Sequence, residues 1–218
     1  YGYPRDVEYF GDRLWFGGTR AEPQRIDASC TGDYTNFGRS SPIVDSDAVS
    51  IMSNARQMNA IVDMVPLDSL LVLTEGNEFM VTGGADKVIS PSTIGMKIQS
   101  NYGADPDVPA KVIGESAVML QAEGPAVRDL AYTFDKDGFR GNEISVWGSH
   151  LFEGYRFGRG IDHWKAPWSV LWFSRADGVR IGITYMPEQD VIGSHWHDTT
   201  GKWLDACSLP GRPDTAGP

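Results

Sequence analysis

Two histidines separated by one residue are the side chains of this sequence best suited to bind a metal ion. His195 and His197 flank Trp196, and alternate residues of a β-strand point to the same side. Imidazole is a common zinc ligand, but His163 and Asp198 are the only obvious further ligands, and neither stands at a diagnostic spacing. We name His195 and His197 as metal candidates, but we expect two ordinary strand histidines and no metal or other cofactor.

A second short motif, Asp135-Lys-Asp-Gly138, resembles the start of a calcium-binding loop. The later oxygen ligands and the closing glutamate of such a loop are missing. Aspartate and glycine are typical turn residues, so the motif predicts a turn between two strands rather than a calcium site.

Familiar catalytic and nucleotide-binding motifs are missing from the sequence. It contains no GxSxG nucleophile elbow, P-loop, GxGxxG or HExxH. A glycan hydrolase would need two facing carboxylates, and among 29 acidic residues the sequence singles out no pair. We therefore expect that the protein is not an enzyme.

The elements that would position any site are short apolar strands separated by glycine-containing turns. Four runs share one pattern, a buried-type strand, a polar turn and a second strand, which is typical of a β-hairpin. They are Arg13–Gly18, Leu70–Gly76, Val118–Gly124 and Ser169–Gly178. Aligning Leu14, Leu71, Met119 and Leu171 gives steps of 57, 48 and 52 residues. A hairpin repeat of about 50 residues is typical of propeller blades. The sequence thus predicts an all-β, propeller-like fold with about four hairpin-based blades; a β-sandwich or barrel is the alternative.

Length and composition are those of a globular all-β protein. The chain has 218 residues, 11% aromatic residues and 25 glycines, and we expect one domain over residues 1–208 with a flexible tail at 209–218. Because it opens at Tyr1 without an initiator methionine, we expect a fragment of a longer polypeptide. Cys30 and Cys207 have no CxxC spacing, and no apolar run is long enough to insert into a membrane.

The net charge of −10 argues against a protein that grips DNA, because no cluster of lysine and arginine is present to bind phosphates. An acidic surface can still line a passage through which DNA slides, since repulsion prevents sticking. The simpler interpretation is that the charge keeps the protein soluble.

Short motifs in a fixed order extend over about residues 3 to 200. They are Tyr3–Thr19, Pro23-Gln24, Gly32–Phe37, Asp45–Ala48, Asn59–Ile61 with Leu67–Gly76 and Glu78-Phe79, Ala126–Asp129, His150–Phe152, and Trp172–Gly178 with Thr184–Gln189. The ordered series resembles that of phage tail nozzle proteins, also described as tail tubular or stabilisation proteins of short-tailed double-stranded DNA phages and prophages. That family opens a blade with a YP…RL.FAGT pattern and continues with GDY.NF, PL..LLVFT.G.E, VRE or VRD, HLF and TY..EQ. In this chain Met186-Pro187 stands where the family often has a polar residue.

The resemblance implies a structural component of the virion tail, made in the cytoplasm of the bacterial host. Such proteins self-associate into a ring, a hexamer in the whole protein, below the portal and adaptor. The ring contacts other tail proteins and passes double-stranded DNA without sequence preference during ejection. Two alternatives remain. One is a tail module that binds host glycans, which Trp164 and Trp168 would favour if they stacked on an open face; the other is a glycan hydrolase.

Aromatic residues in the long loops are the candidates for contacts between subunits. Tyr34 and Phe37 lie between Asp27 and Ser50, and Tyr102 lies between Thr82 and Pro109. Ordered loops of this length are usually functional, and aromatic residues are enriched at protein interfaces. We therefore predict that Tyr34, Phe37 and Tyr102 contact neighbouring subunits.

Overall fold

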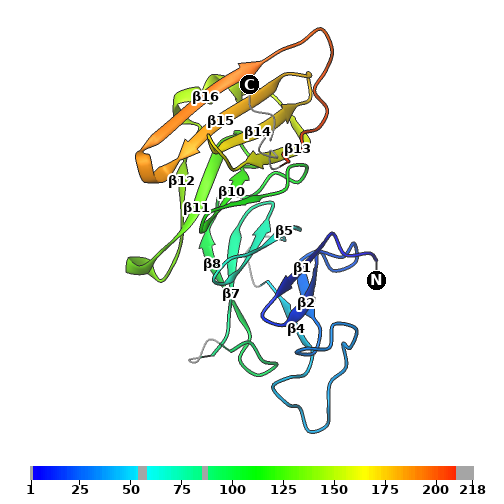
Figure 1. Ribbon diagram of the computed structural model, residues 1–218. Helices are drawn as coiled ribbons and strands as arrows, with labels where there is room; N and C mark the ends of the chain where they lie inside the picture. The colour runs from blue at the N-terminus through cyan, green and yellow to red at the C-terminus, as the bar shows by residue number, and fades with distance from the viewer. Residues whose placement is uncertain (1, 54–57, 85–87, 210–218) are drawn as a thin grey trace, which may run out of the picture. The chain divides into compact units, whose positions relative to one another are not determined.

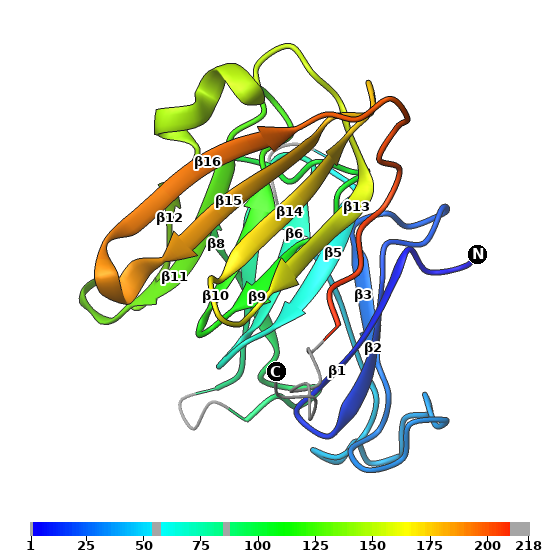
Figure 2. The ribbon, with the colours of Figure 1, turned by 45° about the horizontal axis from the view of Figure 1, so that its top comes forward.

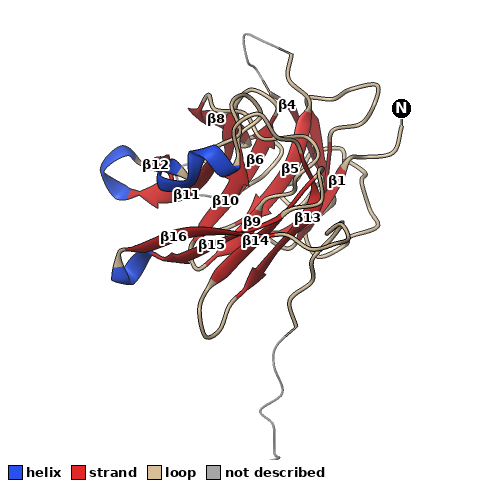
Figure 3. Ribbon diagram, turned by 90° about the horizontal axis from the view of Figure 1, so that it is seen from above, coloured by secondary structure: helices blue, strands red, loops and turns tan. Residues whose placement is uncertain are grey.

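The chain is built almost entirely from β-strands. A computed structural model describes residues 2–53, 58–84 and 88–209, with 46% strand and 6% helix. In these residues the strands form four sheets, each of four antiparallel strands, and none closes into a barrel. Figure 3 shows that helical turns are confined to connections between strands.

Each sheet is a meander, whose strands follow one another in the sequence and lie side by side in that order (Figure 1). The first sheet contains β1 (Asp6–Phe10), β2 (Arg13–Gly17), β3 (Arg25–Ala28) and β4 (Val49–Met52). The second contains β5 (Ile61–Pro66), β6 (Leu70–Thr74), β7 (Glu78–Thr82) and β8 (Gly95–Ser100). The third contains β9 (Lys111–Ile113), β10 (Ser116–Leu120), β11 (Val127–Thr133) and β12 (Gly138–Glu143). The fourth contains β13 (Phe157–Trp164), β14 (Val170–Arg175), β15 (Arg180–Met186) and β16 (Val191–His197). Short 3-10 turns form at η1 (Phe134–Lys136), η2 (Val146–Leu151) and η3 (Pro187–Gln189).

This architecture confirms the predicted all-β, propeller-like fold with about four hairpin-based blades. The four positions aligned in the sequence all fall in the second strand of a sheet. They are Leu14 in β2, Leu71 in β6, Met119 in β10 and Leu171 in β14. Each run continues through a turn into the third strand of the same sheet, as the hairpin pattern predicted.

The chain divides into two compact units. Unit 1 comprises Tyr1–Glu123 and Arg128–Asn142, and contains the first two sheets and nearly all of the third. Unit 2 comprises Gly124–Val127 and Glu143–Pro218, and contains the fourth sheet. The assignment of residues 1–208 to one domain stays a prediction, and the expected tail lies outside the described residues except for Leu209.

The second sheet is the centre of unit 1 because both of its faces are covered. Alternate residues of a strand point to opposite faces, and every residue of β6 is buried. Leu70 and Val72 belong to a cluster that includes Trp15 of the first sheet. Leu71 and Leu73 belong to a cluster that includes Met119 of the third sheet. Figure 2 shows β5 and β6 beside β9 and β10. The uninterrupted apolar run of β6 therefore encodes a strand buried on both sides.

The core of unit 2 lies on one face of the fourth sheet. Leu171 and Phe173 of β14 are paired with Ile183 and Ile181 of β15, and all four side chains are buried. The Phe152 ring, which follows η2, lies 5.8 Å from the Phe173 ring. No helix among the residues that the structure describes is long and apolar enough to span a membrane.

Candidate functional site

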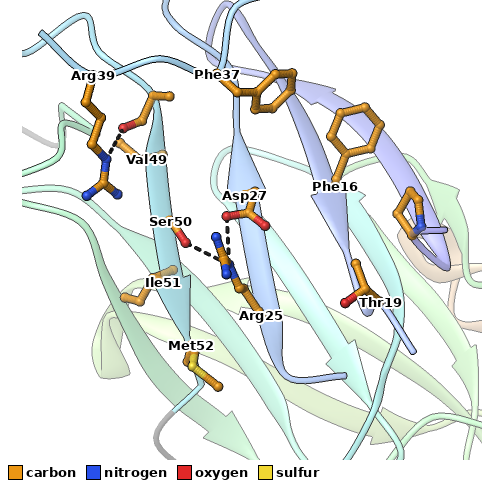
Figure 4. A pocket seen from close by; sticks show the side chains of 12 residues that line it. Phe16, Thr19, Arg25, Asp27, Phe37, Arg39, Val49, Ser50, Ile51 and Met52 are labelled. Carbon is orange, nitrogen blue, oxygen red and sulfur yellow. Dashed lines mark hydrogen bonds and ion pairs between the residues drawn. The ribbon is translucent and has the colours of Figure 1, made fainter. Parts of the chain in front are cut away.

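The outer face of the first sheet carries an open groove of about 760 Å³ (Figure 4). Its floor crosses three strands, where Phe16 of β2 is paired with Asp27 of β3, and Asp27 with Ser50 of β4. The lining residues are Pro4, Phe16, Thr19, Arg25, Asp27, Phe37, Arg39, Ala48, Val49, Ser50, Ile51 and Met52. The alternation of strand residues explains this placement, because Trp15 and Ile26, one residue away from Phe16 and Asp27, point into the core.

Arg25 lies across the middle of the groove floor. Its guanidinium contacts a Glu22 carboxylate oxygen at 2.6 Å and an Asp27 carboxylate oxygen at 2.9 Å, and it donates to Ser50 Oγ at 3.0 Å. Hydrogen bonds to Glu22 and then to Asp27 raise the pKa of Arg25. About a third of each of these side chains is exposed, so each ion pair contributes at most about 1 kcal/mol to stability. The network fixes the position of the Arg25 guanidinium more than it stabilises the fold.

The loop that forms the rim of the groove, residues 29–48, is held from inside by Arg13. The Arg13 guanidinium is buried and donates to the carbonyl oxygens of Ser29 at 2.6 Å, Asp47 at 2.7 Å and Asp45 at 2.9 Å. Burial lowers the pKa of Arg13. Since an unpaired buried carbonyl is costly, this one side chain stabilises the loop by satisfying three of its carbonyl groups.

Asp47 holds the same loop from its other end. Its carboxylate accepts hydrogen bonds from the backbone N–H groups of Ser40 at 2.8 Å and Val44 at 3.0 Å, and from Ser40 Oγ at 2.8 Å. The bonds from Val44 and Ser40 lower the pKa of Asp47. The loop is therefore ordered although residues 31–46 are exposed along their whole length.

Tyr34 and Phe37, two of the predicted subunit contacts, lie on this loop and pack against the first sheet. The Tyr34 ring meets the Tyr9 ring edge-on at 5.2 Å, and the Phe37 ring lies 5.4 Å from the Phe16 ring. They keep 41% and 42% of their surface exposed, so the loop presents two supported aromatic rings at the surface. Their contact with another subunit stays a prediction.

Tyr102, the third predicted contact, lies apart from the groove. It is half-buried and packs against the core cluster shared by the second and third sheets. The Arg128 guanidinium covers its ring at 3.7 Å from the centroid. A Cβ on Gly141 would lie only 2.7 Å from the ring, so glycine at this position makes room for Tyr102. Its role in an interface also stays a prediction.

His195 and His197 lie on the same side of β16, as their spacing predicted, with ring centroids 5.0 Å apart. Both rings pack near Trp172 of β14, and His195 lies over Gly182, where a Cβ would come within 2.0 Å of it. Burial is the main reason why the pKa of His195 is lowered, and charge repulsion from the neighbouring His197 lowers it further. In the part of the chain that the structure describes, no three metal-binding side chains gather.

The two tryptophans considered for glycan binding lie at the end of one hairpin in unit 2. Trp164 is the last residue of β13 and is half-buried, whereas Trp168 lies in the turn before β14 with 60% of its surface exposed.

The Asp135–Gly138 motif forms the turn predicted for it, between β11 and β12. The short helix η1 leads into Asp137, whose φ of 45° is in the left-handed region.

The structure brings together one carboxylate pair that the sequence did not single out. The backbone N–H of Met64 donates to Asp6 at 2.7 Å and to Asp63 at 3.0 Å, and the N–H of Ala110 donates to Asp63 at 2.7 Å. The pKa of Asp63 is raised to about 7. Burial is the largest cause, and the negative charge of Asp6 and its hydrogen bond with Asp63 also raise the pKa. The two carboxyl groups contact each other directly, unlike the pair of a glycosidase, which is separated by roughly 5–9.5 Å.

Arg13 and Glu78 are the other residues that sequence reasoning missed. Arg13, Trp15 and Gly17 are alternate residues of β2, and all three are buried. This alternation could have indicated from the sequence that the Arg13 side chain faces the core. Glu78 is fully buried and accepts hydrogen bonds from the N–H of Gly103 at 2.7 Å and from Ser100 Oγ at 2.6 Å. No local pattern marks its role, because its partners lie more than twenty residues away.

A scan against protein-family models finds no model that matches this chain, and a search of curated proteins finds no match either.

Proposed function

We propose that the chain is a structural component of a phage tail, part of a nozzle ring below the portal through which DNA is ejected. The observation that carries the proposal is the coincidence of two patterns along one chain. The motifs that resemble those of the nozzle family occur in order along the chain. Those around Arg13–Gly17, Leu70–Thr74 and Val170–Arg175 fall on the second strands of the first, second and fourth sheets.

The features of the surface support an assembly role. The loop that carries Tyr34 and Phe37 is exposed but rigidly held by Arg13 and Asp47. A preorganised loop loses little conformational entropy when a partner binds, which favours association. The proposed role requires no catalytic residues, because the side chains act by packing against other subunits. The net charge of −10 is compatible with a passage to which DNA does not adhere.

Electron microscopy of the protein, alone and mixed with its tail partners, tests the proposal. We expect rings with a central channel wide enough for a DNA duplex. A protein that stays dispersed and joins no tail assembly would contradict the proposal, and binding of glycans by the surface around Trp168 would then become the next question.

A further inference from the structure

β16 is an edge strand of the fourth sheet, and only one of its two sides is paired. In an antiparallel ladder, residue pairs that exchange backbone hydrogen bonds alternate with pairs that do not. The N–H of Tyr185 in β15 donates to the carbonyl oxygen of Ser169, on the β14 side, so the even-numbered residues of β15 bond to β16 instead. Their partners in β16 are Val191, Gly193, His195 and His197.

The residues between these partners, Ile192, Ser194 and Trp196, direct their N–H and C=O groups away from β15. None of these backbone groups forms a hydrogen bond with another part of the chain that the structure describes. Figure 2 shows β16 as the outer strand of its sheet. Unpaired groups in such a row are a template for a further strand, because an extended backbone offers donors and acceptors at the same spacing.

The other edge strands of the four sheets carry features that discourage pairing with another chain. These features are charged residues, proline, or a length of only a few residues. The strands are β1 with Asp6 and Glu8, β4 with four residues, β5 with Pro66, β8 with Lys97, β9 with three residues, β12 with Arg140 and Glu143, and β13 with Arg159 and Asp162.

β16 has none of these features. It is seven residues long and pairs with β15 in one uninterrupted register. Its sequence, VIGSHWH, contains no proline, lysine, arginine, aspartate or glutamate. The one edge strand without such protection is therefore also a long one, as expected of an edge that is used for binding.

The face of β16 that continues the core of unit 2 is apolar at this edge. Ile192 and Trp196 are paired with the buried Tyr185 and Ile181 of β15, and keep 39% and 56% of their surface exposed. On the opposite face the edge carries His195 and His197. A strand added to β16 would thus place alternate side chains beside an apolar row and beside a polar row.

The turn η2 lies against the apolar face at the middle of the strand. A Cβ on Gly148 would come within 2.6 Å of the Ser194 side chain, and the residues just before it, Val146 and Trp147, are 54% and 84% exposed. Neighbouring strands are about 4.8 Å apart, whereas a helical turn with its side chains is about 10 Å wide. Two copies of the chain paired through β16 around Ser194 would therefore bring their η2 turns into collision, but a strand without such a turn would rest on Val146 and Trp147.

We propose that an extended segment of another protein pairs with β16 as a fifth strand of the fourth sheet. Its alternate residues are apolar on the side of Ile192 and Trp196, and polar on the side of His195. The unpaired backbone groups require a strand, and the two rows beside them require this alternation. The inference does not depend on the proposed function, which concerns the place of the chain in a virion.

Hydrogen exchange measured by NMR on the purified protein tests whether the edge is available. The amides of Ile192, Ser194 and Trp196 should exchange fast, and those of Gly193 and His195, which bond to β15, should exchange slowly. A capped peptide of alternating threonine and valine should slow the three fast amides when it is added. Slow exchange at all five amides in the protein alone would show an edge that is already covered, and would overturn the proposal.

Two substitutions test the strand pairing through the anisotropy of the same peptide carrying a fluorophore. Ser194→Pro removes an outward N–H and leaves the ladder with β15 intact, whereas Ile192→Lys places a charge at the edge. Each should weaken binding of the peptide about tenfold or more. Val112→Lys is the matched control, because Val112 is 41% exposed and lies on β9 in unit 1, and this variant should bind like the wild type.

Three results would overturn the proposal. The first is a wild type that does not bind the peptide, and the second is binding that neither Ser194→Pro nor Ile192→Lys weakens. The third is a dimer, seen by sedimentation velocity, that Ile192→Lys dissociates, because the edge would then belong to a second copy of the chain. Electron microscopy of tail assemblies tests the proposed function separately, so either proposal can fail without the other.

Discussion

Replacing Asp63 by asparagine should change how the stability of unit 1 depends on pH. In the wild type the Asp63 carboxyl is held against that of Asp6 and accepts the N–H groups of Met64 and Ala110. The asparagine side chain has nearly the same shape, and its carbonyl oxygen can still accept the N–H of Ala110. Its NH₂ group can donate a hydrogen bond to the Asp6 carboxylate. In the wild type, a hydrogen bond between the two carboxyl groups requires a proton on one of them.

The size of the effect follows from the pKa of Asp63, which rises from its ordinary 3.8 to about 7 in the folded chain. The folded state therefore binds a proton more tightly than the unfolded state, and stability is lost as the pH rises through this interval. At 1.36 kcal/mol for each pKa unit the full loss is at most about 4 kcal/mol, spread between about pH 4 and about pH 7. Asp63→Asn should remove this loss.

Urea unfolding at a series of pH values measures the difference between the two proteins. Asp63→Asn should gain stability over the wild type as the pH rises, and Asp198→Asn, at an exposed carboxylate in unit 2, should not. Hydrogen exchange at the Met64 and Ala110 amides reports on the pair directly. Parallel stability curves for the wild type and Asp63→Asn from acid to neutral pH would refute the reasoning.

Three further tests of the packing use urea unfolding, two of them with a matched control substitution. Arg13→Met should cost about 3 kcal/mol or more, because it leaves the buried carbonyls of the rim loop without a donor; an unchanged midpoint would contradict this. Gly103→Ala should cost about 2–3 kcal/mol, since φ is +73° and the new Cβ would stand 2.2 Å from a carbonyl oxygen, whereas Gly114→Ala, at φ +60° in open space, should cost only about 1 kcal/mol. Leu71→Ala should cost about 2–5 kcal/mol and the exposed Met52→Ala less than about 0.5 kcal/mol; equal losses would count against the two-sided burial of β6.

The strands were predictable from the sequence because their signal is local. The buried run of β6 and the alternation in β2 both follow from the period of two, and the same period placed His195 and His197 on one side of β16. The turn at Asp135–Gly138 was also predictable from its residue types.

The polar contacts could not be predicted, because they join segments that are distant in the chain. Asp6 accepts a hydrogen bond from a residue 58 positions away, and Arg13 reaches the carbonyl oxygen of Ile89, 76 positions away. The exposure of Phe134 could not be predicted either: β11 ends at Thr133, and the turn that follows directs the Phe134 ring to solvent. Which side chain a turn exposes depends on its backbone angles, which the residue types alone do not determine.

Immunogold labelling of virions, made from the genome that encodes this chain, tests the central claim most directly. We predict that antibodies against the chain label the tail, below the portal vertex. Particles that carry the chain elsewhere, or that lack it altogether, would contradict the account.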